Sequence, residues 1–400
     1  MQSGRTPDNA EAITPASRRS NPDLLRRVAI TLTILALYQL GRFIPATGIN
    51  AEFSFAANGA NPAYAFDLTP TLSHFALGVT PLFSLLLLAE VFKLAFSDVR
   101  GWAMESRRTR YLGNKVLTVA ALMLAAFQAY GLSTGLEALQ SGYGVRETLP
   151  LLEPGGSFRM TYVASIVTGT ALAIWLADQI TRHGVGSGFW FLFLLPSLLT
   201  LAMTPTRMLS HLAIGDVSTA SVVALLAVLA ASAAAVVILT RQWIALAPAG
   251  ADFDNASDSA RVVLWPSFIA ASAMGLIAAL LNFLIADGDG SGQLLQRGSL
   301  GSALGSAAVI AILTYAMANG MLANETRLRR ETHRLLALTA VTAAITCIAI
   351  DVLAAHLVPF GISGPVWIAI LAVFALLAPR DIGAYLAPRS PSPGLDSVDS

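Results

Sequence analysis

The sequence contains few charged residues. Only 12% of its 400 residues are Asp, Glu, Lys or Arg, whereas 55% are hydrophobic. Soluble domains carry about 25% charged residues, so this composition excludes an ordinary soluble domain and indicates an integral membrane protein. With a formal net charge of +1, the chain is not expected to bind nucleic acid.

Residues that build common catalytic and metal sites are also scarce. The single cysteine, Cys347, excludes an internal disulfide framework and a cysteine metal cluster. The five histidines are scattered, without metal-ligand spacing. A phosphate-binding P-loop, an HExxH motif and a GxSxG motif are all missing. The sequence therefore predicts no metal and no cofactor, and it gives no positive case for an enzyme.

Long apolar runs are abundant. A membrane-spanning helix needs about 17–25 apolar residues, and ten runs fit this length: 24–43, 73–96, 115–136, 160–180, 187–204, 218–240, 263–285, 302–323, 335–357 and 364–386. The polar stretches 1–23 and 388–400 are expected to be disordered tails, and no cleavable signal is expected at the start. The fold class is therefore an all-α polytopic membrane protein.

Lysine and arginine are distributed unevenly between the two sides of the predicted helices. If the N-terminus is cytoplasmic, 20 of the 25 basic residues fall in cytoplasmic segments and 5 fall outside. Because cytoplasmic loops are enriched in basic residues, this asymmetry predicts that both termini are cytoplasmic.

The predicted spans contain almost no ionisable groups. Glu90 and Lys93 are three residues apart and could pair on one helical face. Asp351 is expected at a wetted helix end. Ion-coupled transporters usually place charges at bilayer depth, and these spans do not.

One polar stretch, WLADQITRHGVGSG at 175–188, separates two very apolar runs. Asp178 and Arg182 have the i,i+4 spacing of a helix pair, and alternating glycines follow that favour a tight reversal. The residues alone therefore predict a hairpin between two spans, with six positions of interest: Asp178, Gln179, Arg182, Gly184, Gly186 and Gly188.

This stretch also resembles the SecY family, the channel subunit of the bacterial protein-conducting translocon. Further resemblances follow in order along the chain: LGRFIPATGIN at 40–50, HFALGVTP at 74–81, TRYLG at 109–113, AFQAYGLSTGL at 126–136, WPSFIAAS at 265–272 and VPFGISG at 358–364. The resemblance is strongest over 24–200.

The resemblance implies two inverted five-helix halves, 24–204 and 205–387, around a central pore in the bacterial inner membrane. It implies a polypeptide channel with SecE-like and possibly SecG-like companions, and a plug for which residues 61–72 are the candidate. Aligning the motifs places two side chains of the second helix and one each of the fifth, seventh and tenth helices in the constriction, with Ile368 as an alternative to the last: Val79, Phe83, Phe193, Phe268 and Trp367. This ring is largely aromatic, whereas that of the family is aliphatic.

Two cytoplasmic loops depart from the family, in which they are long, basic and bind the ribosome or the motor ATPase. The loop before 263 is short and acidic here, and 324–335 retains only a basic cluster formed by Arg327, Arg329, Arg330 and Arg334. Contact with lipid head groups is the preferred interpretation of that cluster, so docking of a motor or ribosome is not predicted.

Two other functions remain open at this stage. A small-molecule permease would need polar groups at a broken helix near the membrane midplane. A non-conducting scaffold for another membrane protein would explain the shortened loops. The predicted function is a specialised, divergent channel for translocating or inserting polypeptides.

Overall fold

The computed structural model describes residues 22–50, 72–96, 107–142, 151–152, 157–215, 217–245, 253–284, 300–322, 329–356 and 364–377. Within these ranges it contains ten α-helices, and its only β-structure is two isolated bridges, Pro45 to Ser73 and Ile49 to Leu152. The helices are α1 (Pro22–Gly41), α4 (Thr80–Ala95), α6 (Arg107–Gly142), α7 (Phe158–His183), α8 (Gly188–Ala213), α9 (Thr219–Ala245), α10 (Phe253–Leu284), α11 (Leu300–Leu322), α12 (Arg329–His356) and α13 (Gly364–Leu377).

Each helix overlaps one of the ten predicted spans, which confirms an all-α polytopic fold. Six of the described helices are long and apolar enough to cross a membrane by themselves, and α10, α11 and α13 contain shorter apolar stretches. Most of the candidate spans are less than half buried within the chain. In a bilayer such apolar faces are covered by lipid, because lipid tails are as apolar as leucine.

Helix α4 is shorter than the sequence predicts. The apolar run begins at 73, but the helix begins at Thr80, with Pro81 in its first turn. Proline is favoured there because the first helical N–H groups have no partner within the helix. Gly78, just before the helix, has a φ of +50°, a conformation that glycine adopts without the penalty other residues incur.

Much of the helix packing repeats between two halves, although α10 packs more closely on α9 and α13 than α4 does on α1 and α8. In the first half α7 packs on α1, α6 and α8, while α1 contacts α8 and α4 contacts α6. In the second half α12 packs on α9, α11 and α13, while α9 contacts α13 and α10 contacts α11. Five spans in each half would start the second copy from the opposite membrane face, as in an inverted repeat.

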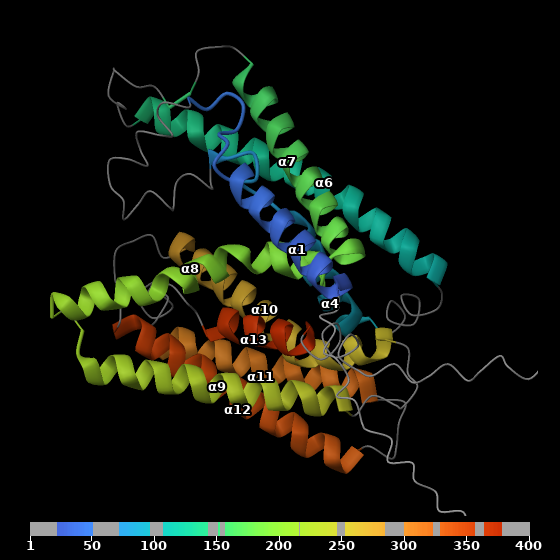
Figure 1. Ribbon diagram of the computed structural model, residues 1–400, viewed down its shortest axis with the longest axis vertical. Helices are drawn as coiled ribbons and strands as arrows, with labels where there is room; N and C mark the ends of the chain where they lie inside the picture. The colour runs from blue at the N-terminus through green and yellow to red at the C-terminus, as the bar shows by residue number, and fades with distance from the viewer. Residues whose placement is uncertain are drawn as a thin grey trace, which may run out of the picture.

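Figure 1 shows α1, α4, α6 and α7 as one group and α9 to α13 as another, with α8 lying between the two groups. The expected boundary between 204 and 205 falls inside α8, which continues through Pro205 to Ala213. The described end of α8 thus lies nine residues beyond the end of the fifth apolar run, and the division of the chain into halves stays a prediction.

Helices α10 and α12 begin earlier than predicted, which shortens the stretches before them. Helix α10 begins at Phe253, so Asp254 and Asp258 lie in its first two turns, where acidic residues favour the positive end of the helix dipole. Helix α12 begins at Arg329. Residues 246–252 and 323–328 separate these two helices from the helices before them and lie outside the described residues. Both stretches have fewer residues than the loops expected from the sequence.

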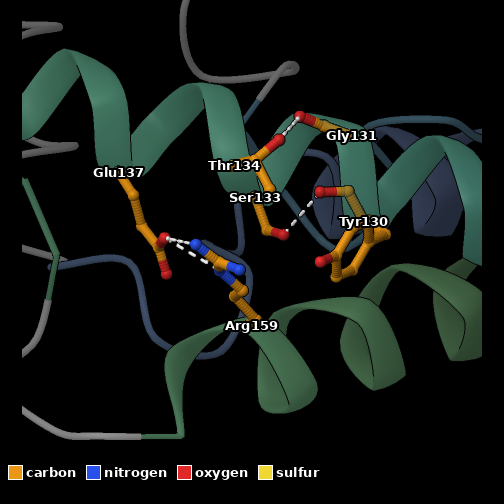
Figure 2. Close-up of polar contacts among 6 residues, drawn as sticks. All are labelled: Tyr130, Gly131, Ser133, Thr134, Glu137 and Arg159. Atoms are coloured by element: carbon orange, nitrogen blue, oxygen red, sulfur yellow. Dashed lines mark hydrogen bonds and ion pairs between the residues drawn. The ribbon is translucent and has the colours of Figure 1, made fainter.

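An ion pair joins α6 to α7 at their adjacent ends (Figure 2). The Nε and Nη2 of Arg159 both donate to Oε2 of Glu137, at 2.8 and 2.5 Å, and the guanidinium lies 5.9 Å from the Tyr130 ring centroid. Both side chains of the pair are substantially exposed. Exposed ion pairs contribute little to the free energy of unfolding, so this contact is expected to add little to the stability of the α6–α7 packing.

Hydrogen bonds from one buried and one partly buried tryptophan tie the second half together around α9. Trp243 Nε1 donates to Thr339 Oγ1 of α12 at 2.9 Å, and Trp367 Nε1 of α13 donates to Ser232 Oγ at 2.9 Å. A buried indole N–H without a partner would be costly. The two bonds therefore fix the rotations of α12 and α13 relative to α9.

Candidate functional site

Three phenylalanines from three different helices meet at one point. Phe83 of α4 stacks on Phe193 of α8 with ring centroids 4.1 Å apart, and Phe268 of α10 lies 5.1 Å from Phe83 and 5.5 Å from Phe193 at near-perpendicular angles. These offset and edge-to-face arrangements are the favourable ones for aromatic rings. The structure thus brings together three of the five side chains that the sequence motifs selected for a constriction.

Two tryptophans that the sequence analysis missed extend this cluster. Trp190 of α8 lies 5.5 Å from Phe268 and 5.6 Å from Trp265 of α10, and Trp265 lies 6.2 Å from Phe83. Each tryptophan precedes its phenylalanine by three residues, the spacing that puts two side chains on one helix face. That shared spacing is the signal that could have identified them. We call these five residues the aromatic cluster: Phe83, Trp190, Phe193, Trp265 and Phe268.

A cavity of about 230 Å³ lies beside the aromatic cluster. Its walls come from the second, fifth, seventh and tenth described helices, and none of the lining residues is charged: Phe83, Phe193, Leu194, Ser197, Phe268, Ala271, Ser272 and Val366. Narrow apolar passages expel water and so stop ions. The four helices therefore line an uncharged cavity that includes two serine hydroxyl groups, and its role as a constriction stays a prediction.

The other two predicted constriction residues lie elsewhere. Val79 is only 2% exposed and packs with Tyr38 and Phe75 in a cluster that Phe193 also contacts, so it lies next to the aromatic cluster and not within it. Trp367 does not reach the aromatic cluster, because its indole is bonded to Ser232 on α9. Helix α13 instead presents Val366 to the cavity, and Ile368 is fully buried in the surrounding core.

The polar stretch at 175–188 forms the tight reversal between α7 and α8 that the sequence predicts. Asp178 and Arg182 form an ion pair of 2.7 Å with both side chains largely exposed, and Gln179 is half-buried. Gly186 has a φ of +76°, which favours glycine. A Cβ on Gly184 would overlap Thr31 of α1, and one on Gly188 would overlap the Ala177 carbonyl of α7.

Helix α1 takes part in this reversal, which the sequence did not reveal. The Val185 amide donates to Thr31 Oγ1 at 2.9 Å, and the Thr31 hydroxyl donates to the Arg27 carbonyl at 3.0 Å. Thr31 is only 6% exposed. Three helices of the first half therefore meet where α8 begins, and their contacts set the direction in which α8 carries Phe193 to the aromatic cluster.

The predicted basic cluster lies at the start of α12. Arg329 and Arg330 are its first two residues, Arg334 follows about one turn later with an exposed side chain, and Arg327 lies outside the described residues. The plug candidate 61–72 also lies outside them except for Leu72, which is buried in a cluster with Ala46, Ile49 and Phe158.

The described residues offer little acid–base or metal chemistry. No group of three or more His, Cys, Asp or Glu side chains in those ranges could hold a metal ion. The Glu90–Lys93 pair of α4, at 2.8 Å, fits the helical-face pairing expected from the sequence. The aromatic cluster and its cavity are therefore the candidate functional site in this part of the chain.

Comparison with protein families gives one match, to the family described as SecY, over residues 73–319. Curated relatives include the protein translocase subunits SecY of Rickettsia bellii, 28% identical over 180 residues, and of Thermus thermophilus, 30% identical over 175 residues. These alignments cover 43% and 42% of this chain. They cover only 41% and 39% of the two relatives, so less than half of each relative's length is matched.

Solved structures resemble the chain over almost its whole length. One is described as the structure of a protein-conducting channel, with a TM-score of 0.51 and 14% identity, and another as Sec61 in a canine ribosome–channel complex, with a TM-score of 0.53 and 13% identity. Each comparison covers 92% of this chain and 95% of the other. At such identities the likeness shows a common fold.

Proposed function

Since this chain belongs to the SecY family, whose model matches more than half of its residues, we propose that it is a channel subunit that translocates polypeptides or inserts them into the membrane. It is a multi-pass membrane protein, and its curated relatives are from bacteria. Both facts support a location in the bacterial inner membrane. Its termini would both be cytoplasmic, as the distribution of basic residues indicates.

The observation that carries this proposal is the aromatic cluster with its cavity. Phe83, Phe193 and Phe268 come from helices of both halves and contact one another directly. A seal made of side chains from separate helices opens when those helices move apart, and no bond within one helix has to break. An uncharged opening of this kind passes an extended chain without binding any one side chain strongly.

The partners follow from the same proposal. Small SecE-like and SecG-like subunits would cover part of the apolar surface that the described helices leave exposed, and lipid would cover the rest. The connections at 246–252 and 323–328 leave little chain for docking a motor ATPase or a ribosome. A specialised channel with few clients, or with another energy source, fits such short connections.

Complementation of a bacterium depleted of its own channel tests this proposal. The chain would be tested both unaltered and as a hybrid in which 246–252 and 323–328 are replaced by the corresponding loops of the host protein. We expect the hybrid to restore export of at least one secreted protein, and the unaltered chain to restore less, because docking is the missing step. A hybrid that reaches the membrane and exports no client would count against the channel.

A further inference from the structure

Helices α8 and α13, the fifth of each half, begin with the same unusual contact. Gly188 is the first residue of α8, and a Cβ there would overlap the carbonyl oxygen of Ala177 on α7. Gly364 is the first residue of α13, and a Cβ there would lie 2.5 Å from Cys347 Cα on α12. Real Cβ atoms do not approach backbone so closely. Both positions therefore require glycine, and each lets a pore helix start directly on the backbone of the preceding helix.

A side chain of the preceding helix holds the amide of each glycine. Gly188 N donates to Thr181 Oγ1 at 3.0 Å, and Gly364 N donates to Asp351 Oδ1 at 2.7 Å. The first N–H groups of a helix have no partner inside it, so each bond satisfies one of them. In both halves the acceptor follows the contacted residue by four positions, Ala177 to Thr181 and Cys347 to Asp351. Four positions are about one helical turn.

We call the glycine contact and its amide hydrogen bond together a joint. One joint connects α7 to α8 and the other connects α12 to α13, and the two are copies of one arrangement. They connect the fourth and fifth helices of each half, and the helix pairs around them also correspond between the halves. Because the halves contain five spans each, the two joints belong to opposite faces of the membrane. The side chains differ in one respect, since the acceptor is a neutral hydroxyl in the first half and a carboxyl in the second.

The joints act on the walls of the cavity. Helix α8 contributes Phe193, Leu194 and Ser197 to it, and α13 contributes Val366. Helix α13 is held a second time by the bond from Trp367 to Ser232. Helix α4 begins differently, because its first amide, Thr80 N, donates at 3.0 Å to the carbonyl of Leu77 just before it and so bonds locally. Two walls of the cavity are thus bonded at their first residue to the preceding helix, whereas the first amide of α4 bonds within its own segment.

We infer that Thr181 and Asp351 are positioning residues that hold α8 and α13 fixed on α7 and α12 while the pore opens through movement of the remaining walls. The expected effect of Thr181 and Asp351 on ion conduction rests on the proposed channel function. The anchoring itself is a property of the fold and is measured separately.

The test uses the full-length protein reconstituted in liposomes, with spin labels on exposed positions of each helix pair. Labels at Val341 and Phe374 report the distance between α12 and α13, and labels at Leu172 and Leu209 report that between α7 and α8; all four side chains are more than 40% exposed. Cys347 is fully buried and stays in place. The variants are Asp351→Leu and Thr181→Val, each compared with a conservative change that keeps an acceptor oxygen, Asp351→Asn and Thr181→Ser.

We expect Asp351→Leu to shift or broaden the α12–α13 distance and to leave the α7–α8 distance unchanged, with the converse for Thr181→Val. The conservative variants should keep the original distances. Loss of one anchor should also raise the resting ion leak about tenfold, the factor that 1.4 kcal/mol gives.

Unchanged distances in both Asp351→Leu and Thr181→Val would overturn the inference, as would equal shifts in the conservative variants. If Asp351→Leu does not fold, Thr181→Val decides, because valine has nearly the shape of threonine. Shifted distances without any leak would support the anchoring and would instead contradict the proposed conduction.

Discussion

Replacing Phe83 and Phe193 together by alanine should turn the resting protein into an ion-leaking channel. The two rings stack at 4.1 Å between α4 and α8, and both line the cavity. Removing them widens the apolar passage, which then admits water and ions. The closed state also loses the ring contact, worth about 0.5–1.5 kcal/mol beyond area burial, whereas an open state has already separated the rings. A shift of one to two kcal/mol raises the open population roughly 5- to 30-fold.

Ion efflux from liposomes containing the purified protein measures this effect. The matched control is the double variant Phe92→Ala and Phe96→Ala, which removes another stacked pair, 5.9 Å apart at the end of α4, whose rings are 46% and 53% exposed. Both double variants lose two rings, but only the first should leak. Equal efflux from the two variants would show that the aromatic cluster does not seal the protein.

A single methyl group at Gly169 should strongly destabilise the fold. A Cβ at this position of α7 would overlap the backbone carbonyl of His74, and would lie 2.7 Å from its carbonyl carbon. The same segment is also fastened to α7 by Ser165, whose hydroxyl lies 2.5 Å from His74 Nδ1. Backbone on both sides leaves little room to relax. Gly169→Ala should therefore cost at least about 1–3 kcal/mol, the usual range for overpacking.

The control for this prediction is Gly131→Ala on α6. Gly131 has no heavy atom within 4 Å of its added Cβ, and its carbonyl accepts a hydrogen bond from Thr134 that the change leaves intact (Figure 2). Replacing a helical glycine by alanine stabilises by about 0.5–1 kcal/mol when the site is open. Thermal unfolding in detergent should thus move in opposite directions for the two variants. A parallel change in both midpoints would contradict the close approach of α7 to His74.

The sequence predicts the helices well because the bilayer restricts the possible structures. Backbone polar groups in lipid must bond within a helix, so each long apolar run has one outcome, and every run found corresponds to a helix. The ends of the helices follow less closely. Helix α10 begins ten residues before its apolar run. Polar residues such as Asp254 are as compatible with the first turn of a helix as with a loop, so the sequence did not show where the helix begins.

The constriction was only partly predictable for a different reason. Phe83 and Phe268 follow Pro81 and Pro266 by two residues, so a motif places them without any knowledge of the fold. Trp367 has no such landmark, and its orientation depends on Ser232, a residue 135 positions away. The joint between Asp351 and Gly364 was equally hidden, because Asp351 alone suggested only a wetted helix end. Contacts of this kind arise from tertiary packing, which local patterns do not encode.

Site-specific photocrosslinking in cells tests the channel most directly. A photoreactive amino acid would replace Phe83 or Phe193 in the aromatic cluster, and Phe127, which is 76% exposed on α6, as the control position. We expect the first two positions to capture exported or membrane-inserting chains, and the control position to capture none of them. Capture of a single resident membrane protein from Phe83 and Phe193, or of nothing, would contradict a polypeptide channel and would favour a non-conducting scaffold.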